Sequence, residues 1–146
     1  MEIVRMSTTH VSRIAKLESV CFSTPWSENS IKSELTNPLS LWLVALEENV
    51  VAGYIGSQSV LGEADMMNVA VAPEYRRRGI GKQLVCELVN SLRLQQVHCL
   101  TLEVRVSNTS AIALYEQLGF QQVGIRPRYY SSPKEDALIL RKEWEL

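Results

Sequence analysis

The sequence is poor in the residues that build disulfide frameworks and metal sites. It has three cysteines, Cys21, Cys86 and Cys99, which are odd in number, widely spaced and form no C-x-x-C pair. Its two histidines, His10 and His98, are also far apart and are expected to be structural or surface groups. Disulfide frameworks and zinc sites need paired or clustered ligands. We therefore expect no metal cofactor and a reducing, cytoplasmic environment.

Long apolar runs and a dominant charge are also missing. No segment approaches the roughly 20 apolar residues that cross a membrane, and charged residues interrupt the first 22 residues, which argues against a secretory signal. Fifteen Lys and Arg residues nearly balance sixteen Asp and Glu residues, for a net charge of -1. Nucleic acids and anionic membranes usually select a basic face. The expected partners are therefore small molecules or peptides, with no nucleic acid and no membrane.

The sequence does have enough apolar residues for one core, at 46% of 146 residues, so residues 1–146 are expected to form a single domain. Alternating short strands and helices predict a mixed α/β fold, with a central, largely antiparallel sheet split around one parallel pair and about four helices. The expected strands cover 2–6, two runs within 41–60 around a turn at 47–49, 63–71, 99–106, 120–125 and 137–141. The expected helices cover 8–22, 25–35, a segment through 84–92, and 109–118.

Local signals add detail to two of these helices and to the core. Thr8 or Thr9 is expected to cap the first helix, and Ser27 the second. On the helix through 84–92, the apolar neighbours of Cys86 predict a buried, inert thiol. Trp42 is expected in the core.

One turn concentrates positive charge and bare backbone. Within the stretch NVAVAPEYRRRGIGKQLVCEL, the seven residues Arg76–Lys82 include three arginines, one lysine and two glycines. A helix start has unpaired amides and partial positive charge, and glycine lets an anion approach the backbone. The turn therefore predicts a site for a small polyanion, with a solvated basic turn as the alternative. The spacing fits neither a P-loop nor a dinucleotide fingerprint, which require residues that are absent here.

The pattern R-x-x-G-x-G, together with LEVRVSNTSAIALYEQLGF further along, resembles the GCN5-related N-acetyltransferases. The segments TPWSENSI, MNVAVAPEYRRRGIG and RPRYY are similar to those of the bacterial ribosomal-protein-alanine N-acetyltransferases. Those enzymes acetylate the N-terminal alanine of a small-subunit ribosomal protein. The resemblance implies acetyl-CoA as co-substrate, direct transfer, and a protein N-terminus as acceptor.

The resemblance also implies which residues would bind acetyl-CoA. The backbone of one group would hold the pantetheine and the acetyl carbonyl: Val69, Ala70 and Val71. A second group would hold the pyrophosphate: Arg77, Arg78, Gly79, Ile80, Gly81 and Lys82. Asn108 would contact another part of CoA.

The same resemblance implies that Glu103 accepts a proton and that Tyr115 donates one. An amine must be neutral to attack a thioester, and an α-amine with pKa about 8 loses its proton more readily than a lysine at about 10.4. Glu103 lies on the polar side of its strand, where it could act directly or through a water, and a phenol could protonate the departing thiolate. Spacing alone also fits a strand carboxylate paired with Arg105 and a core tyrosine.

The acceptor is less constrained than the cofactor. Trp26, Tyr129 and Tyr130 are candidates to line a peptide groove. The same CoA-binding residues could serve an enzyme that acetylates a small-molecule amine or a protein lysine. They could also belong to a regulatory module that binds CoA without turnover. The presence of both Glu103 and Tyr115 favours an enzyme.

Overall fold

A seven-stranded sheet forms the centre of the structure, with the strand order β1-β2-β3-β4-β5-β7-β6. The computed structural model describes all residues from 1 to 146. The strands are β1 (Glu2–Arg5), β2 (Ser40–Glu47), β3 (Val50–Val60), β4 (Glu63–Val71), β5 (Cys99–Arg105), β6 (Gln121–Ser131) and β7 (Lys134–Glu143). The helices are α1 (Thr8–Cys21), α2 (Glu28–Ser33), α3 (Ile80–Leu94) and α4 (Thr109–Gln117), with a short 3-10 helix η1 (Pro73–Tyr75). The predicted mixed α/β fold class is confirmed.

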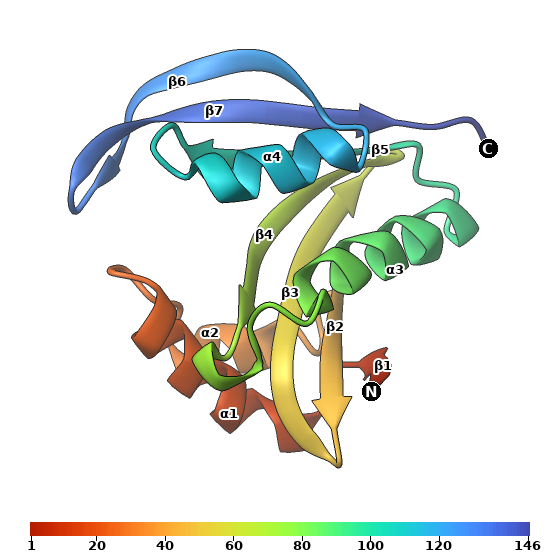
Figure 1. Ribbon diagram of the computed structural model, residues 1–146. Coiled ribbons are helices and arrows are strands. Elements are labelled where there is room, and N and C mark those ends of the chain that lie inside the picture. The colour runs from red at the N-terminus through yellow and green to blue at the C-terminus, as the bar shows by residue number, and fades with distance from the viewer.

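The only parallel pair in the sheet is β4 with β5, and it is short. Three residue pairs join these strands, from Glu63↔Cys99 to Asp65↔Thr101, whereas all other neighbours are antiparallel. Beyond these pairs the two strands diverge, as Figure 1 shows. The facing edges of β4 and β5 therefore have no strand partner from that point on.

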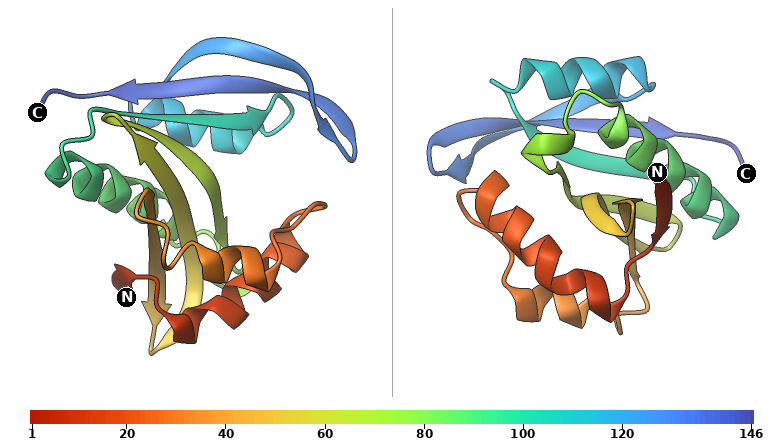
Figure 2. Two further views of the ribbon diagram at one scale, coloured as in Figure 1. Left: turned by 180° about the vertical axis from the view of Figure 1, so that it is seen from behind. Right: turned by 60° about the horizontal axis from the view of Figure 1, so that its bottom comes forward.

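Two apolar clusters cover the two faces of the sheet, and alternating residues of β2 divide between them. Leu41 and Leu43 join the cluster that contains the buried stripe of α3, whereas Trp42 and Val44 join the cluster of α1 and α2. Figure 2 shows α1 and α2 on one face of strands β2 to β4 and α3 on the other. Trp42 is buried, as predicted from the sequence.

The helix ends and the thiol on α3 differ in part from the prediction. Ser7, and not Thr8 or Thr9, caps α1, because its backbone is extended (φ -123°, ψ 172°) and its N–H donates to His10 Nδ1 at 3.0 Å. Ser27 caps α2 as predicted, its hydroxyl accepting the Ser30 N–H at 3.1 Å. The prediction of a buried Cys86 is wrong. Its side chain is exposed because the buried stripe of α3 lies on the other side of the helix.

The β6–β7 hairpin is longer than the predicted strands 120–125 and 137–141. The stretch from Arg126 to Ser131 lacks apolar alternation, and the pairing register shifts between Arg126 and Tyr130. An irregular, exposed edge strand of this kind gives no period-two signal. The added length carries the hairpin tip as far as the loop after α1, where Ser23 contacts Ser132.

None of the helices combines the length and the apolar character needed to cross a bilayer, and the longest, α3, has 15 residues.

Candidate active site

A pocket of about 690 Å³ opens where β4 and β5 diverge. Its walls come from the end of α1 and the following loop, from β4 and β5, from α4 and from the β6–β7 hairpin. The structure brings these sequence-predicted residues together in its lining: Trp26, Val69, Glu103, Asn108, Tyr115, Tyr129 and Tyr130. The other predicted cofactor residues are not in this lining. They follow at the end of β4, in the turn before α3 and in the first turn of α3.

Glu103 reaches the pocket because β5 alternates. Leu102 and Val104 are buried, and Glu103 points to the opposite side, with its side chain 22% exposed. Its carboxylate forms an ion pair with Arg126, whose Nε lies 3.2 Å from Glu103 Oε1. The alternative pairing with Arg105 is wrong, because the Arg105 guanidinium reaches the hairpin tip instead. Glu103 therefore combines access to the pocket with one cationic neighbour.

Tyr115 belongs both to the core and to the pocket wall. Its side chain is 6% exposed and packs edge-to-face on Phe120, with 5.6 Å between the ring centroids. Burial, with a smaller contribution from Tyr130, raises the pKa of Tyr115 to about 12. The phenol therefore remains protonated at neutral pH and can act as a hydrogen donor.

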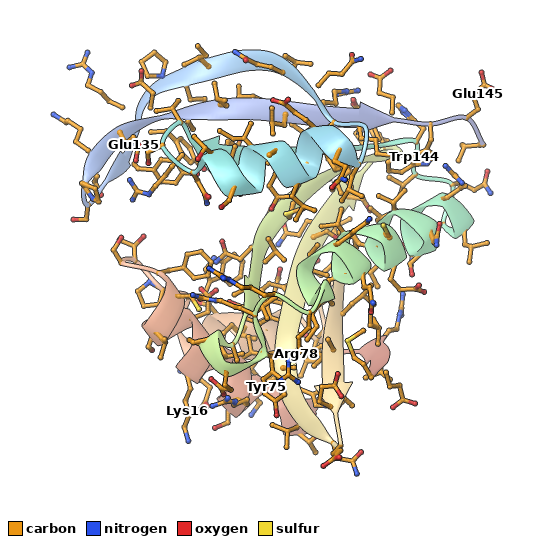
Figure 3. The ribbon with its side chains drawn as sticks, viewed as in Figure 1. Lys16, Tyr75, Arg78, Glu135, Trp144 and Glu145 are labelled. Atoms are coloured by element: carbon orange, nitrogen blue, oxygen red, sulfur yellow. The ribbon has the colours of Figure 1, made fainter.

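Arg105 fixes the tip of the β6–β7 hairpin over the pocket. Its guanidinium donates to the carbonyl oxygens of Pro133 (2.9 Å) and Ser132 (3.1 Å) and to the Glu135 carboxylate (3.1 Å). The guanidinium also lies 4.2 Å from the centroid of the Tyr130 ring. Figure 3 shows Glu135 beside the start of α4. The rigid guanidinium fork thus sets the position of Tyr130 in the pocket.

The turn after η1 leaves its amides available. Gly79 is the N-cap of α3, with a φ of 76° and no side chain to cap the helix, so the amides of the first helical turn have no capping partner. Arg77 also has a positive φ of 65°. Two of the seven turn residues therefore adopt a left-handed backbone.

The cations of this turn are also unpaired. Arg76, Arg77, Arg78 and Lys82 take part in none of the ion pairs of the structure. The Arg78 guanidinium lies 5.2 Å from the centroid of the Tyr75 ring, and Figure 3 shows the two side chains together. Amides without a capping partner and cations without an ion-pair partner, together on one turn, meet the requirements of a phosphate site.

Sequence reasoning missed Glu18, which is fully buried beside the pocket. Its carboxylate accepts from the Tyr54 hydroxyl, from the Trp26 N–H at 2.8 Å and from Asn68 Nδ2 at 2.9 and 3.0 Å. Burial and, secondarily, Glu18 raise the pKa of Tyr54, so this hydroxyl stays a donor. The sequence did contain a signal for this buried acid. Glu18 follows Ile14 by four residues and therefore lies on the apolar face of α1.

The chain matches the model of the Acetyltransferase (GNAT) family over residues 11–120. The [Ribosomal protein bS18]-alanine N-acetyltransferase of Salmonella typhimurium is 39% identical over 138 residues, which are 92% of each chain. The crystal structure of the ribosomal-protein-S18-alanine N-acetyltransferase from Escherichia coli has a TM-score of 0.91 and 35% identity, covering 99% of this chain and 94% of that chain. The crystal structure of the NatC complex bound to Gag peptide and CoA has a TM-score of 0.82 and 26% identity, covering 99% of this chain and 100% of that chain.

These likenesses extend over nearly the whole chain and include the glycine turn, both strands that line the pocket, and α4. Acetyl-CoA is the acetyl donor of the acetyltransferase (GNAT) family, as the sequence resemblance implied. The protein is a member of the acetyltransferase (GNAT) family.

Proposed function

We propose that this protein transfers the acetyl group of acetyl-CoA directly to the N-terminal alanine of the ribosomal protein bS18. The observation that carries the proposal is one pocket that contains both Glu103 and Tyr115 and borders the β4 strand leading into the phosphate turn. The names of the Salmonella and Escherichia coli relatives support the choice of acceptor.

Acetyl-CoA would lie against the free edge of β4. The segment Val69–Val71 pairs with β3 on one side, and its other edge has no strand partner, so backbone groups there are available to the pantetheine. The pyrophosphate would bind at Arg77–Lys82. Asn108 caps α4 through its Oδ1, which accepts the Ala111 N–H at 3.3 Å, and this leaves Nδ2 free for CoA.

The reaction moves one proton from nitrogen to sulfur. The neutral amine attacks the thioester carbon, and the Glu103 carboxylate accepts a proton from the nitrogen directly or through a water. The carbon–sulfur bond then breaks, and the Tyr115 hydroxyl donates to the leaving thiolate. The products are an acetylated N-terminus and CoA.

Gly81→Val is expected to weaken acetyl-CoA binding by roughly tenfold or more, which corresponds to about 1.4 kcal/mol. A Cβ at Gly81 would meet only Val71 Cγ2, at 3.8 Å, so the fold accepts a side chain here. The branched side chain would instead keep the phosphates away from the backbone amides. Isothermal titration calorimetry at two salt concentrations measures the effect, with Gly81→Ala as the smaller substitution. A folded Gly81→Val variant that binds as tightly as the parent contradicts the phosphate site.

The proposed acceptor predicts that an alanine-initiated peptide is acetylated at its α-amine much faster than at a lysine. The neutral fraction of an α-amine at pH 7 exceeds that of lysine by more than about a hundredfold. Mass spectrometry after incubation with acetyl-CoA identifies the modified nitrogen, and serine- and methionine-initiated peptides report the breadth of the site. Equal rates on the same peptide with a blocked N-terminus and an internal lysine would exclude this acceptor class.

A further inference from the structure

The side-chain amide of Asn68 is held in one orientation. Its Nδ2 donates to both oxygens of the buried Glu18 carboxylate, at 2.9 and 3.0 Å. A carboxylate only accepts hydrogen bonds, so a flipped amide would place Oδ1 against two oxygens. Glu18 therefore fixes which end of the Asn68 amide points away from it.

The Oδ1 atom of Asn68 is an unused acceptor at the pocket. No donor of the protein contacts it, whereas Nδ2 is fully engaged. The buried side-chain atoms without a partner are Arg13 Nε and Ser40 Oγ, so the unpaired Oδ1 is accessible from outside the protein. Asn68 lines the same pocket as Glu103 and Tyr115.

A β-bulge places Asn68 at this position. Gly56 pairs with Asn68 and Ser57 pairs with Met66, so Met67 is the extra residue of β4. The bulge shifts the alternation of β4 by one residue, and Asn68 faces α1, which carries Glu18.

The Glu18 carboxylate takes part in no ion pair of the structure. Its hydrogen-bond partners are a hydroxyl, a backbone N–H and an amide. The guanidinium of Arg76, near the end of α1, donates to Val71 O and Cys21 Sγ and not to Glu18. A buried negative charge without a counterion attracts a cation in the adjoining pocket.

We propose that Asn68 is a substrate-binding residue whose Oδ1 accepts an N–H from the protonated N-terminal amine of the acceptor. Glu18 is the positioning residue that holds the amide and adds the attractive potential. This inference rests on the proposed function. An α-amine with pKa about 8 arrives mainly as an ammonium at pH 7, with three donors and one positive charge. Asn68 binds this form, the ammonium then releases one proton to the solvent, and the neutral amine that remains attacks the thioester and passes one further proton to Glu103.

The test compares two peptides that differ only in the amine. One begins with alanine, and the other carries a propanoyl group in place of the alanyl residue. Each is titrated into the CoA-loaded enzyme, in which no transfer occurs. The parent is expected to bind the alanine peptide roughly tenfold or more tightly than the propanoyl peptide, because a hydrogen bond to a charged group is lost in the latter.

Asn68→Ala is expected to bring this affinity ratio close to one, while CoA affinity and the affinity for the propanoyl peptide stay near parental values. A purely structural role would weaken both peptides equally, and that result overturns the proposal. Asn90→Ala, at an exposed position on α3, is the matched control. If Asn68→Ala does not fold, Asn68→Leu keeps the branched shape of the side chain at Cγ and is expected to give the same loss of the ratio.

The outcomes separate this inference from the proposed function. A parent that acetylates the alanine peptide, with Asn68 variants that retain the full amine preference, overturns the inference alone. A parent that neither acetylates the peptide nor prefers the amine overturns both. Glu18→Gln gives a further check, because a glutamine amide can donate to Oδ1 and allow the Asn68 amide to flip, and the preference for the amine should then fall.

Discussion

Glu103→Gln is expected to lower turnover by roughly 10²–10⁴-fold, the usual range for general acid–base assistance, while acetyl-CoA binding remains near the parental value. Gln keeps the shape of the side chain and removes its capacity to accept a proton. The effect should appear in kcat with saturating acetyl-CoA and an alanine-initiated peptide. At subsaturating acceptor, the parental rate should rise with pH through about 8 as the amine becomes neutral.

Arg126→Gln is the control that separates a base from a strand ion pair. Arg126 Nε lies 3.2 Å from the Glu103 carboxylate, and its own side chain is 55% exposed. Removing this cation breaks the ion pair but leaves the carboxylate in the pocket. Exposed pairs contribute little to stability, so the variant should fold and keep most of its turnover. Equal losses in Glu103→Gln and Arg126→Gln would instead assign Glu103 a structural role.

Tyr115→Phe is expected to lower turnover by roughly 10²-fold or more without changing folding or CoA affinity, since it removes one hydroxyl and keeps the ring against Phe120. The loss should shrink with a thioester whose leaving thiol is more acidic, because a better leaving group needs less protonation. Stopped-time assays with the two thioesters and a thermal melt measure these effects. A variant with parental turnover on both thioesters would show that Tyr115 is a core residue and not the proton donor.

The raised pKa of Tyr115 sets the alkaline side of the pH profile. The donor acts in its neutral form, and burial raises its pKa to about 12. An acid with a raised pKa stays protonated to higher pH, so the Tyr115 hydroxyl loses its proton only as the pH rises toward 12. The parental rate should therefore climb with deprotonation of the amine and then stay level to about pH 10. A fall with a midpoint below pH 10 would contradict Tyr115 as the donor.

Local periodicity predicted most of the fold. β2, β3 and β4 carry clear apolar runs separated by short turns, and the stripe of α3 is buried as expected. The prediction fell short where side chains carry no period, as in the second half of β6, and where a cap depends on backbone conformation, as at Ser7. Cys86 shows that apolar neighbours in sequence do not place a helical residue on the apolar face.

Part of the candidate site could likewise be predicted from the sequence, and part could not. The turn before α3 and the residues Glu103 and Tyr115 sit in short motifs, so a resemblance could locate them. Their catalytic roles stay predictions. Glu18, Tyr54 and Asn68 come from three elements separated along the chain, and only the folded sheet with its bulge brings them into contact. No spacing in the sequence encodes that contact.

The part of the chain up to β4 and the part from β5 onward contact each other on both sides of the pocket. On one side three residue pairs join β4 to β5, and on the other side the Ser23 hydroxyl donates to Ser132 O at 2.8 Å, which links the loop after α1 to the hairpin tip. The walls of the pocket are thus joined on both sides of the candidate reaction centre. A free chain end needs less width between two joined walls than an internal segment, which would have to enter as a doubled loop, so we expect the pocket to admit chain ends more readily.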